Sequence, residues 1–193
     1  MTDQTYPTSL GIIPARGGSK GVLRKNIRSV AGQPLIAYAI NAANSSKFLT
    51  RFVISTEDDE IASIGRSLGC EVIQRPADLA GDKAPMVPVV LHALSAVEES
   101  SGVKFEYGVI LQPTAPLRTG EDIDSAIQLL FDTGADSVVS VDLVSDYHPS
   151  RMYRLEDEKL VQYAPEPDGR LRQDLPPVYH RNGAIYAFRR TLV

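Results

Sequence analysis

Short apolar runs alternate along the chain with stretches in which apolar residues recur at every third or fourth position. The runs are typical of buried strands and cover residues 10–14, 52–55, 71–74, 107–111, 137–141 and 183–188. The spaced stretches predict helices over residues 35–45, 59–68, 87–97 and 121–130. Because strand–helix alternation of this kind produces right-handed crossovers, we expect an α/β fold with a mainly parallel sheet and helices on both of its faces.

Residues at the predicted helix ends support these boundaries. Pro34 stands at the start of the first helix, where its fixed φ suits helical backbone. Gly69 follows the second helix and is a typical C-terminal stop. Thr119 and Asp122 are spaced as in a capping arrangement at the start of the fourth helix.

The alternation breaks over residues 147–180, which contain five of the 13 prolines and the turn-forming sequence EPDG. We expect a loop-rich excursion here, with a hairpin near residues 151–163. It separates a core formed by residues 1–146 from a return to the core sheet over residues 181–193. Because the chain ends at Val193, directly after a predicted strand, we also expect that a C-terminal remainder of the domain is missing.

Positive charge is concentrated near the N-terminus of a chain that is acidic as a whole. The 193 residues suit one compact domain, and the net charge of -4 argues against general nucleic-acid binding. Residues 4–56 contain no Asp or Glu but seven Lys or Arg, five of them between Arg16 and Arg28. This concentration favours an anion-binding site; the alternative is a solvated basic loop.

Other features of the sequence bear on its compartment. Cys70 is the only cysteine, so the chain forms no internal disulfide, and we expect this residue in the core rather than as a nucleophile. No apolar run approaches the roughly 20 residues that span a membrane, and the N-terminal residues do not follow the plan of a secretory signal. We therefore expect a cytoplasmic protein without a membrane partner.

The sequence GIIPARGGSKGVLRKN, residues 11–26, runs from the first predicted strand into a loop rich in glycine and cations. In open parallel sheets, ligands bind beyond the carboxyl ends of the strands. Gly17 and Gly18 allow unusual backbone conformations and a close approach of N–H groups to a ligand. Arg16, Lys20 and Lys25 can neutralise phosphate oxygens. The loop fits neither the Walker A nor the G-x-G-x-x-G pattern, so we predict a phosphate site of another type.

These residues resemble the N-terminal signature of the acylneuraminate cytidylyltransferases, the CMP-sialic acid and CMP-nonulosonate synthetases. The resemblance extends over nearly the whole chain through further motifs in the expected order: VIST, RPADLAGDKA, LQPTAPLRTGEDID, ADSVVSV, RQDLP and NGAIY. It implies a Rossmann-like nucleotidyltransferase fold in which residues 147–180 form a small dimerisation segment. It also implies that CTP activates a nonulosonic, sialic-acid-like sugar, giving a CMP-sugar and pyrophosphate.

The resemblance assigns a role to each matched residue. Arg16 and Lys25 would grip the phosphates with help from Lys20, although Lys20 reads equally well as a solvated side chain. The residues implied to bind nucleotide are Ala15, Arg16, Gly17, Gly18, Lys25, Asn26, Arg75, Asp82 and Ala84. The residues implied to bind sugar are Gln112, Arg172, Asn182 and Tyr186. Arg118 is expected to organise its loop rather than to touch substrate.

Mg²⁺ is the expected cofactor, because transfer from a triphosphate normally uses it to bridge phosphate oxygens. The family's usual D-x-D ligands do not occur in this chain after Tyr186, so no metal ligand is assigned. Pro85 and Met86 stand where the family has Ser or Thr, which leaves base selectivity open. A Kdo-type cytidylyltransferase and a nucleotide-binding module without efficient turnover remain the alternatives, and which nonulosonic acid is used stays open.

Overall fold

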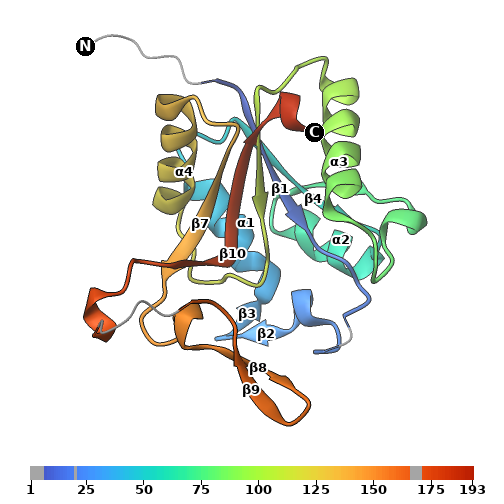
Figure 1. Ribbon diagram of the computed structural model, residues 1–193. Helices are drawn as coiled ribbons and strands as arrows, with labels where there is room; N and C mark the ends of the chain where they lie inside the picture. The colour runs from blue at the N-terminus through green and yellow to red at the C-terminus, as the bar shows by residue number, and fades with distance from the viewer. Residues whose placement is uncertain (1–6, 20, 166–170) are drawn as a thin grey trace. The chain divides into compact units, whose positions relative to one another are not determined.

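The computed structural model describes residues 7–19, 21–165 and 171–193, without the side chain of Arg172. The chain forms two compact units, Met1–Ser140 with Gly183–Val193, and Val141–Asn182 (Figure 1). The excursion predicted over residues 147–180 lies inside the second unit.

A six-stranded sheet with the order β5-β4-β1-β6-β10-β7 forms the centre of the fold. Its strands are β1 (Ser9–Pro14), β4 (Arg51–Thr56), β5 (Glu71–Gln74), β6 (Tyr107–Leu111), β7 (Ser137–Leu143) and β10 (Tyr179–Arg189). β1 runs parallel to β4 and β6, and β4 runs parallel to β5. β10 runs antiparallel to β6. The six predicted strands and the mainly parallel sheet are confirmed.

Helices cover both faces of this sheet, as the alternating pattern predicts. The four helices are α1 (Leu35–Ser45), α2 (Asp59–Ser67), α3 (Met86–Ser101) and α4 (Gly120–Thr133). On one face, Ile36 of α1, Ile61 of α2 and Ile127 of α4 share a buried cluster with strand residues. On the other face, Val90 and Leu94 of α3 pack against β1 and β4 in a separate cluster.

The predicted helix ends are present. Thr119 and Asp122 form a reciprocal capping box at the start of α4. Gly69 has φ +76° just after α2, where a side chain would be strained. α1 begins at Leu35, immediately after Pro34, because residues 29–34 form a tight ribbon of β2 (Ser29–Val30) and β3 (Gln33–Pro34) that the apolar pattern did not predict.

The second unit contains the predicted hairpin, formed by β8 (Tyr153–Glu156) and β9 (Lys159–Gln162). Its remaining turns are organised around His148, whose ring nitrogens lie 2.7 Å from Ser150 Oγ and 3.1 Å from the carbonyl oxygen of Pro176. Among the described residues, no helix is both long and apolar enough to cross a membrane.

Candidate active site

A cavity of about 300 Å³ lies beyond the carboxyl ends of β1 and β6. Its polar lining includes Arg16, Lys25, Asn26, Arg75 and Gln112. These side chains come from connections that follow β1, β5 and β6, which are distant in sequence but bring their carboxyl ends to one edge of the sheet. The fold therefore brings together five of the residues predicted to bind nucleotide or sugar.

Gly17 and Gly18 lie in the β1–α1 connection between Arg16 and Ser19, which line the cavity, although neither glycine is part of the lining. The Gly17 N–H donates to Glu57 Oε1 over 2.7 Å. A Cβ on Gly17 would lie 2.2 Å from Asp58 Oδ2, whereas a Cβ on Gly18 would meet no atom within 4 Å. Neither glycine has a positive φ, so the expected need for unusual backbone conformations is wrong. What requires glycine at position 17 is the close approach of Asp58.

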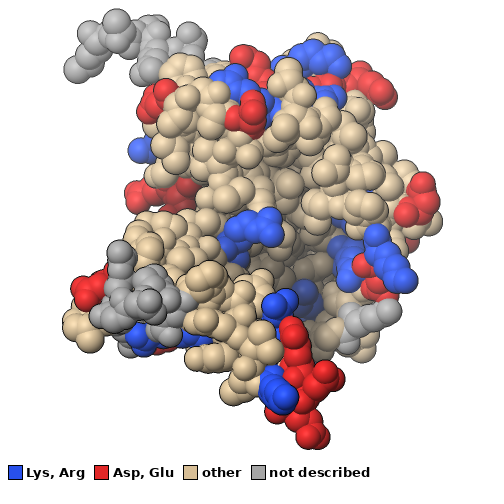
Figure 2. Space-filling view, viewed as in Figure 1, with Lys and Arg blue, Asp and Glu red and all other residues tan. Residues whose placement is uncertain are grey.

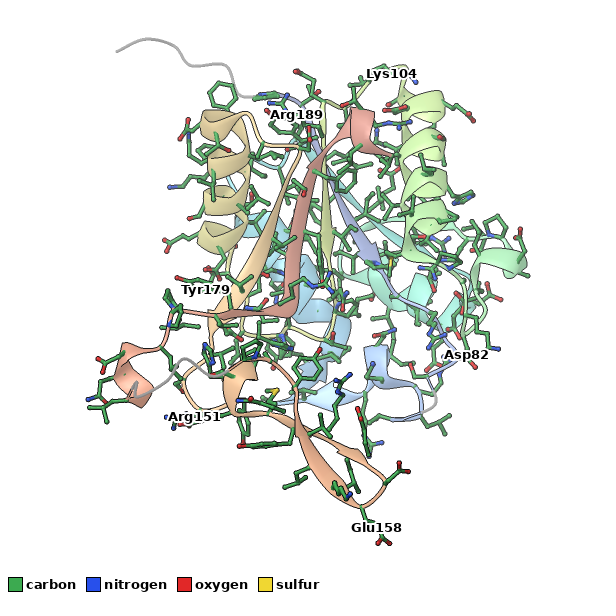
Figure 3. The ribbon with its side chains drawn as sticks, in the orientation of Figure 1. Asp82, Lys104, Arg151, Glu158, Tyr179 and Arg189 are labelled. Carbon is green, nitrogen blue, oxygen red and sulfur yellow. The ribbon has the colours of Figure 1, made fainter. Side chains whose placement is uncertain are left out.

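Carboxylates from other elements reach the cationic loop, although its own sequence contains none. Arg16 Nη1 lies 2.9 Å from Asp82 Oδ1, and both side chains are about one-third exposed. Arg24 pairs with Asp58 and Glu60, and the hydrogen bond from Arg24 is the main reason that the pKa of Asp58 falls below its usual value. Figure 2 shows cationic and acidic side chains next to one another on the right of the view, where Figure 3 labels Asp82. Local sequence does not predict these pairs, because each joins segments that are distant along the chain.

Lys25 differs from the two arginines. It lines the cavity and forms no ion pair with any residue that the structure describes. Its ammonium group can therefore meet an anion directly, whereas Arg16 must exchange Asp82 for one. Lys20, the third predicted catalytic cation, lies outside the described residues.

Two residues predicted to bind nucleotide hold the loop through main-chain groups. Asn26 is 5% exposed, and its Nδ2 donates to the carbonyl oxygen of Arg16 over 2.9 Å. Ala15 is fully buried and donates its N–H to the carbonyl oxygen of Ser55. Both contacts fix the backbone from which the Arg16 side chain projects.

Arg75 is a buried cation at the cavity wall. Its Nε donates to Ser55 Oγ over 3.1 Å, and its Nη2 donates to the Ser55 carbonyl oxygen over 2.6 Å. Burial lowers its pKa, and Glu57, 4.0 Å away, partly opposes that shift. Glu57 thus links Arg75 to the N–H of Gly17. Sequence reasoning missed Glu57. It could have been predicted near the loop, because it directly follows β4, the strand beside β1.

The other predicted nucleotide ligands lie away from the cavity lining. Asp82 pairs with Arg16, and Ala84 donates its N–H to the Gly81 carbonyl oxygen over 3.0 Å. Neither residue lines the cavity. Met86, at a position where a hydroxyl was expected from the resemblance, does line it.

The predicted sugar-binding residues divide between the two units. Gln112 follows β6 and lines the polar cavity, and it also lines a mainly apolar cavity of about 330 Å³ with Tyr186 and Met86. Asn182 belongs to the second unit, where its Nδ2 donates to Asp142 Oδ1 over 3.1 Å. Arg172 lies in the short helix η4 (Arg172–Asp174), and its side chain is outside the description.

Cys70 lies in the buried core, as predicted, and that burial raises the pKa of its thiol to about 12, which disfavours the thiolate. Within the described residues, no three His, Cys, Asp or Glu side chains form a group that could hold a metal ion.

Comparison with known proteins gives this geometry its context. A family model described as cytidylyltransferase matches residues 10–191. The chain is 38% identical to the CMP-N,N'-diacetyllegionaminic acid synthase of Legionella pneumophila, covering 92% of this chain and 76% of that protein. It is 32% identical to the N-acylneuraminate cytidylyltransferase of Escherichia coli, covering 92% of this chain but only 41% of that protein.

Solved structures show the same fold. The CMP:2-keto-3-deoxy-manno-octonic acid synthetase complexed with CTP superposes with a TM-score of 0.68 at 19% identity, covering 96% of this chain and 75% of that one. The Rossmann-like nucleotidyltransferase fold is thereby confirmed. With a family model matched over nearly its whole length and a cation-lined cavity where the parallel strands end, the chain belongs to the cytidylyltransferase family.

Proposed function

We propose that this chain transfers the cytidylyl group of CTP to a nonulosonic acid, giving a CMP-sugar and pyrophosphate. The observation that carries the proposal is the polar cavity in which Lys25, Arg16 and Arg75 lie at the same sheet edge as Gln112. Cations suit a polyphosphate, whereas an amide suits a sugar hydroxyl. The relatives whose names specify legionaminic acid and N-acylneuraminate support a nonulosonic acceptor.

In the proposed reaction, the anomeric hydroxyl of the acceptor attacks the α-phosphorus of CTP. A new bond forms from that oxygen to phosphorus, and the hydroxyl proton passes to solvent. The bond from the α-phosphorus to the bridging oxygen breaks, and pyrophosphate leaves with the bonding electrons. Orienting the two substrates can contribute about 7–11 kcal/mol of barrier lowering. Lys25 and Arg16 neutralise phosphate charge, and Lys20 is proposed to assist them. Arg16 has to give up Asp82 as the nucleotide enters.

The nucleotide is proposed to lie along the β1–α1 connection. Gly17 and Gly18 leave room for the phosphates beside the main chain, with Ala15 behind them. Asn26 supports the loop at the ribose side. Arg75, Asp82 and Ala84 are proposed to border the cytosine, which requires residues 82–84 to approach the cavity when Asp82 releases Arg16.

The acceptor is proposed to bind Gln112 and Tyr186 in the first unit. Asn182 and Arg172, which belong to the second unit, are proposed as sugar-binding residues on the basis of the resemblance. An ulosonic acid carries a carboxylate, for which the guanidinium of Arg172 is a suitable partner.

Mg²⁺ is proposed to accompany CTP. The described residues do not by themselves form a site that fits the ion, but Mg²⁺ usually binds through one or two carboxylates together with substrate phosphates. None of the roles given above depends on the ion. Removal of Mg²⁺ with a chelator should abolish turnover, and its addition should restore it; full activity in the chelator would contradict this assignment.

A homodimer is proposed through the second unit, which exposes large apolar side chains. These include Leu143, Tyr147, Leu155, Leu160 and Tyr163, all more than half exposed. Sedimentation at micromolar concentration should give the mass of a dimer, and L155E/L160E should give a monomer. A monomeric wild type would contradict the proposal.

The cytoplasm, where CTP is made available, is the proposed location.

The reaction itself is tested by pyrophosphate release from CTP in the presence of N-acetylneuraminate, a diacetylated legionaminic acid, pseudaminic acid or Kdo. We expect release with a nonulosonic acid and little with Kdo. Turnover with Kdo alone would identify the Kdo-type alternative. CTP binding without turnover on any acceptor would identify a nucleotide-binding module instead.

A further inference from the structure

β6 and β10 separate at the edge of the cavity. Their last paired residues are Leu111 and Ile185. The carbonyl oxygens of the next residues, Gln112 and Ala184, both accept a hydrogen bond from Nη1 of Arg118, over 3.1 Å and 2.8 Å. One guanidinium nitrogen thus joins the two strands at the point where their main-chain pairing ends.

Burying a guanidinium at this place has a cost in stability that its two hydrogen bonds have to offset. Arg118 is 7% exposed and forms no ion pair within the described part of the chain. Its Nε and Nη2 are buried without a hydrogen-bond partner among the described residues. Burial lowers its pKa to about 10, only partly opposed by Asp122, so the charged form is disfavoured on folding. An apolar side chain of similar size would avoid that cost but would leave the two carbonyl oxygens without this donor.

Two residues of the proposed acceptor site lie beside the contacts of Arg118: Gln112 just after β6, and Tyr186 one position inside the paired part of β10. Gly183, with φ +79°, lies directly before Ala184. A Cβ on Gly183 would lie 3.7 Å from Gln112 Oε1 and 3.9 Å from the Tyr186 hydroxyl oxygen. The amide of Gln112 and the hydroxyl of Tyr186 therefore converge just beyond the point that Arg118 fixes.

We propose that Arg118 is a positioning residue for the acceptor: its bonds to the Gln112 and Ala184 carbonyl oxygens fix the end of β6 against the middle of β10, so that Gln112 and Tyr186 face the sugar together. The expected effect on acceptor kinetics rests on the proposed function. The expected effect on the mobility of β6 and β10 rests on the structure alone. Arg118 does not touch the substrate in this arrangement.

The test compares Arg118→Met and Arg118→Lys with a matched control, Arg189→Met. Arg189 also donates from its side chain to a main-chain carbonyl oxygen, that of Ala135, over 3.0 Å. It is the last residue of β10 and follows Ala184 by five positions along the chain (Figure 3 labels Arg189). Loss of Arg189 should therefore cost stability without changing acceptor kinetics.

For Arg118→Met we expect kcat/KM for the acceptor to fall about tenfold or more, with the KM for CTP unchanged. Amide hydrogen exchange should rise in residues 111–118 and 183–186 but not in β1. Arg118→Lys keeps one donor nitrogen and should therefore recover part of both effects. If the Met variant does not fold, the Lys variant is used for the test. Equal changes in the Arg189→Met control, or unchanged exchange and acceptor kinetics in both Arg118 variants, would overturn the proposal. If the wild type shows no sugar activation, the proposed function fails, while hydrogen exchange still decides whether Arg118 fixes the end of β6 against β10.

Discussion

Replacing both Arg16 and Lys25 by alanine is expected to lower kcat/KM for CTP by at least about 10³-fold, because one preorganised donor on developing charge contributes about 10²–10³-fold. Lys25→Ala alone should have the larger effect of the two single changes. Lys25 has no ion pair among the described residues. Arg16 has to break its ion pair with Asp82 before it binds phosphate, which reduces its net contribution to binding. Initial rates of pyrophosphate release over a range of CTP concentrations measure these effects.

Lys47→Ala is the matched control, because Lys47 belongs to the same acid-free N-terminal stretch but is exposed and absent from the cavity lining. It removes the same charge and should leave the rate within about twofold, since the field of an exposed charge is largely screened beyond a Debye length. Equal losses in Lys47→Ala and Lys25→Ala would mean that general positive charge, and not a phosphate site, explains the result.

Gly17→Ala is expected to reduce activity at least about 100-fold and to lower the free energy of unfolding by about 2–3 kcal/mol. The new Cβ would lie 2.2 Å from Asp58 Oδ2, so Asp58 has to move. That carboxylate caps α2 by accepting from the N–H groups of Glu60 and Ile61, and it also pairs with Arg24. One methyl group therefore disturbs both the loop and the helix behind it. Urea unfolding and a CTP titration measure the two effects.

Gly18→Ala is the control for stability. A Cβ there would have nothing within 4 Å, and Gly18 has no positive φ, so the free energy of unfolding should stay within about 0.5 kcal/mol. If Gly17→Ala were as stable as Gly18→Ala and bound CTP normally, the close approach of Asp58 would not explain why position 17 is glycine.

Local sequence predicts most of the sheet and its helices because each buried element carries its own apolar spacing. Strand β6 and helix α1 have the predicted boundaries. β10 begins earlier than predicted, because its first residues are polar and exposed and so lack the apolar pattern. The β2–β3 ribbon was missed because each of its strands has only two residues, too few to show an apolar pattern.

The electrostatics of the site follow from the order of strands, which local sequence does not contain. Glu57 and Asp58 reach the glycine loop because β4 lies beside β1. Asp82 reaches Arg16 from a loop 66 positions away. The cations between Arg16 and Arg28 predicted an anion site, and two of them, Arg16 and Lys25, line the cavity. Their count overstates the positive charge left for a ligand, because carboxylates pair with Arg16 and Arg24. The role inferred for Arg118 depends on two carbonyl oxygens whose proximity only the folded sheet reveals.

The location of CTP is tested most directly by chemical acetylation of lysines, followed residue by residue with mass spectrometry, at CTP concentrations from zero to saturation. A nucleotide in the β1–β6 cavity should slow the modification of Lys25 at least about tenfold, while Lys47 and Lys159 react at unchanged rates. Saturating CTP that leaves the Lys25 rate unchanged would place the nucleotide elsewhere and contradict the account.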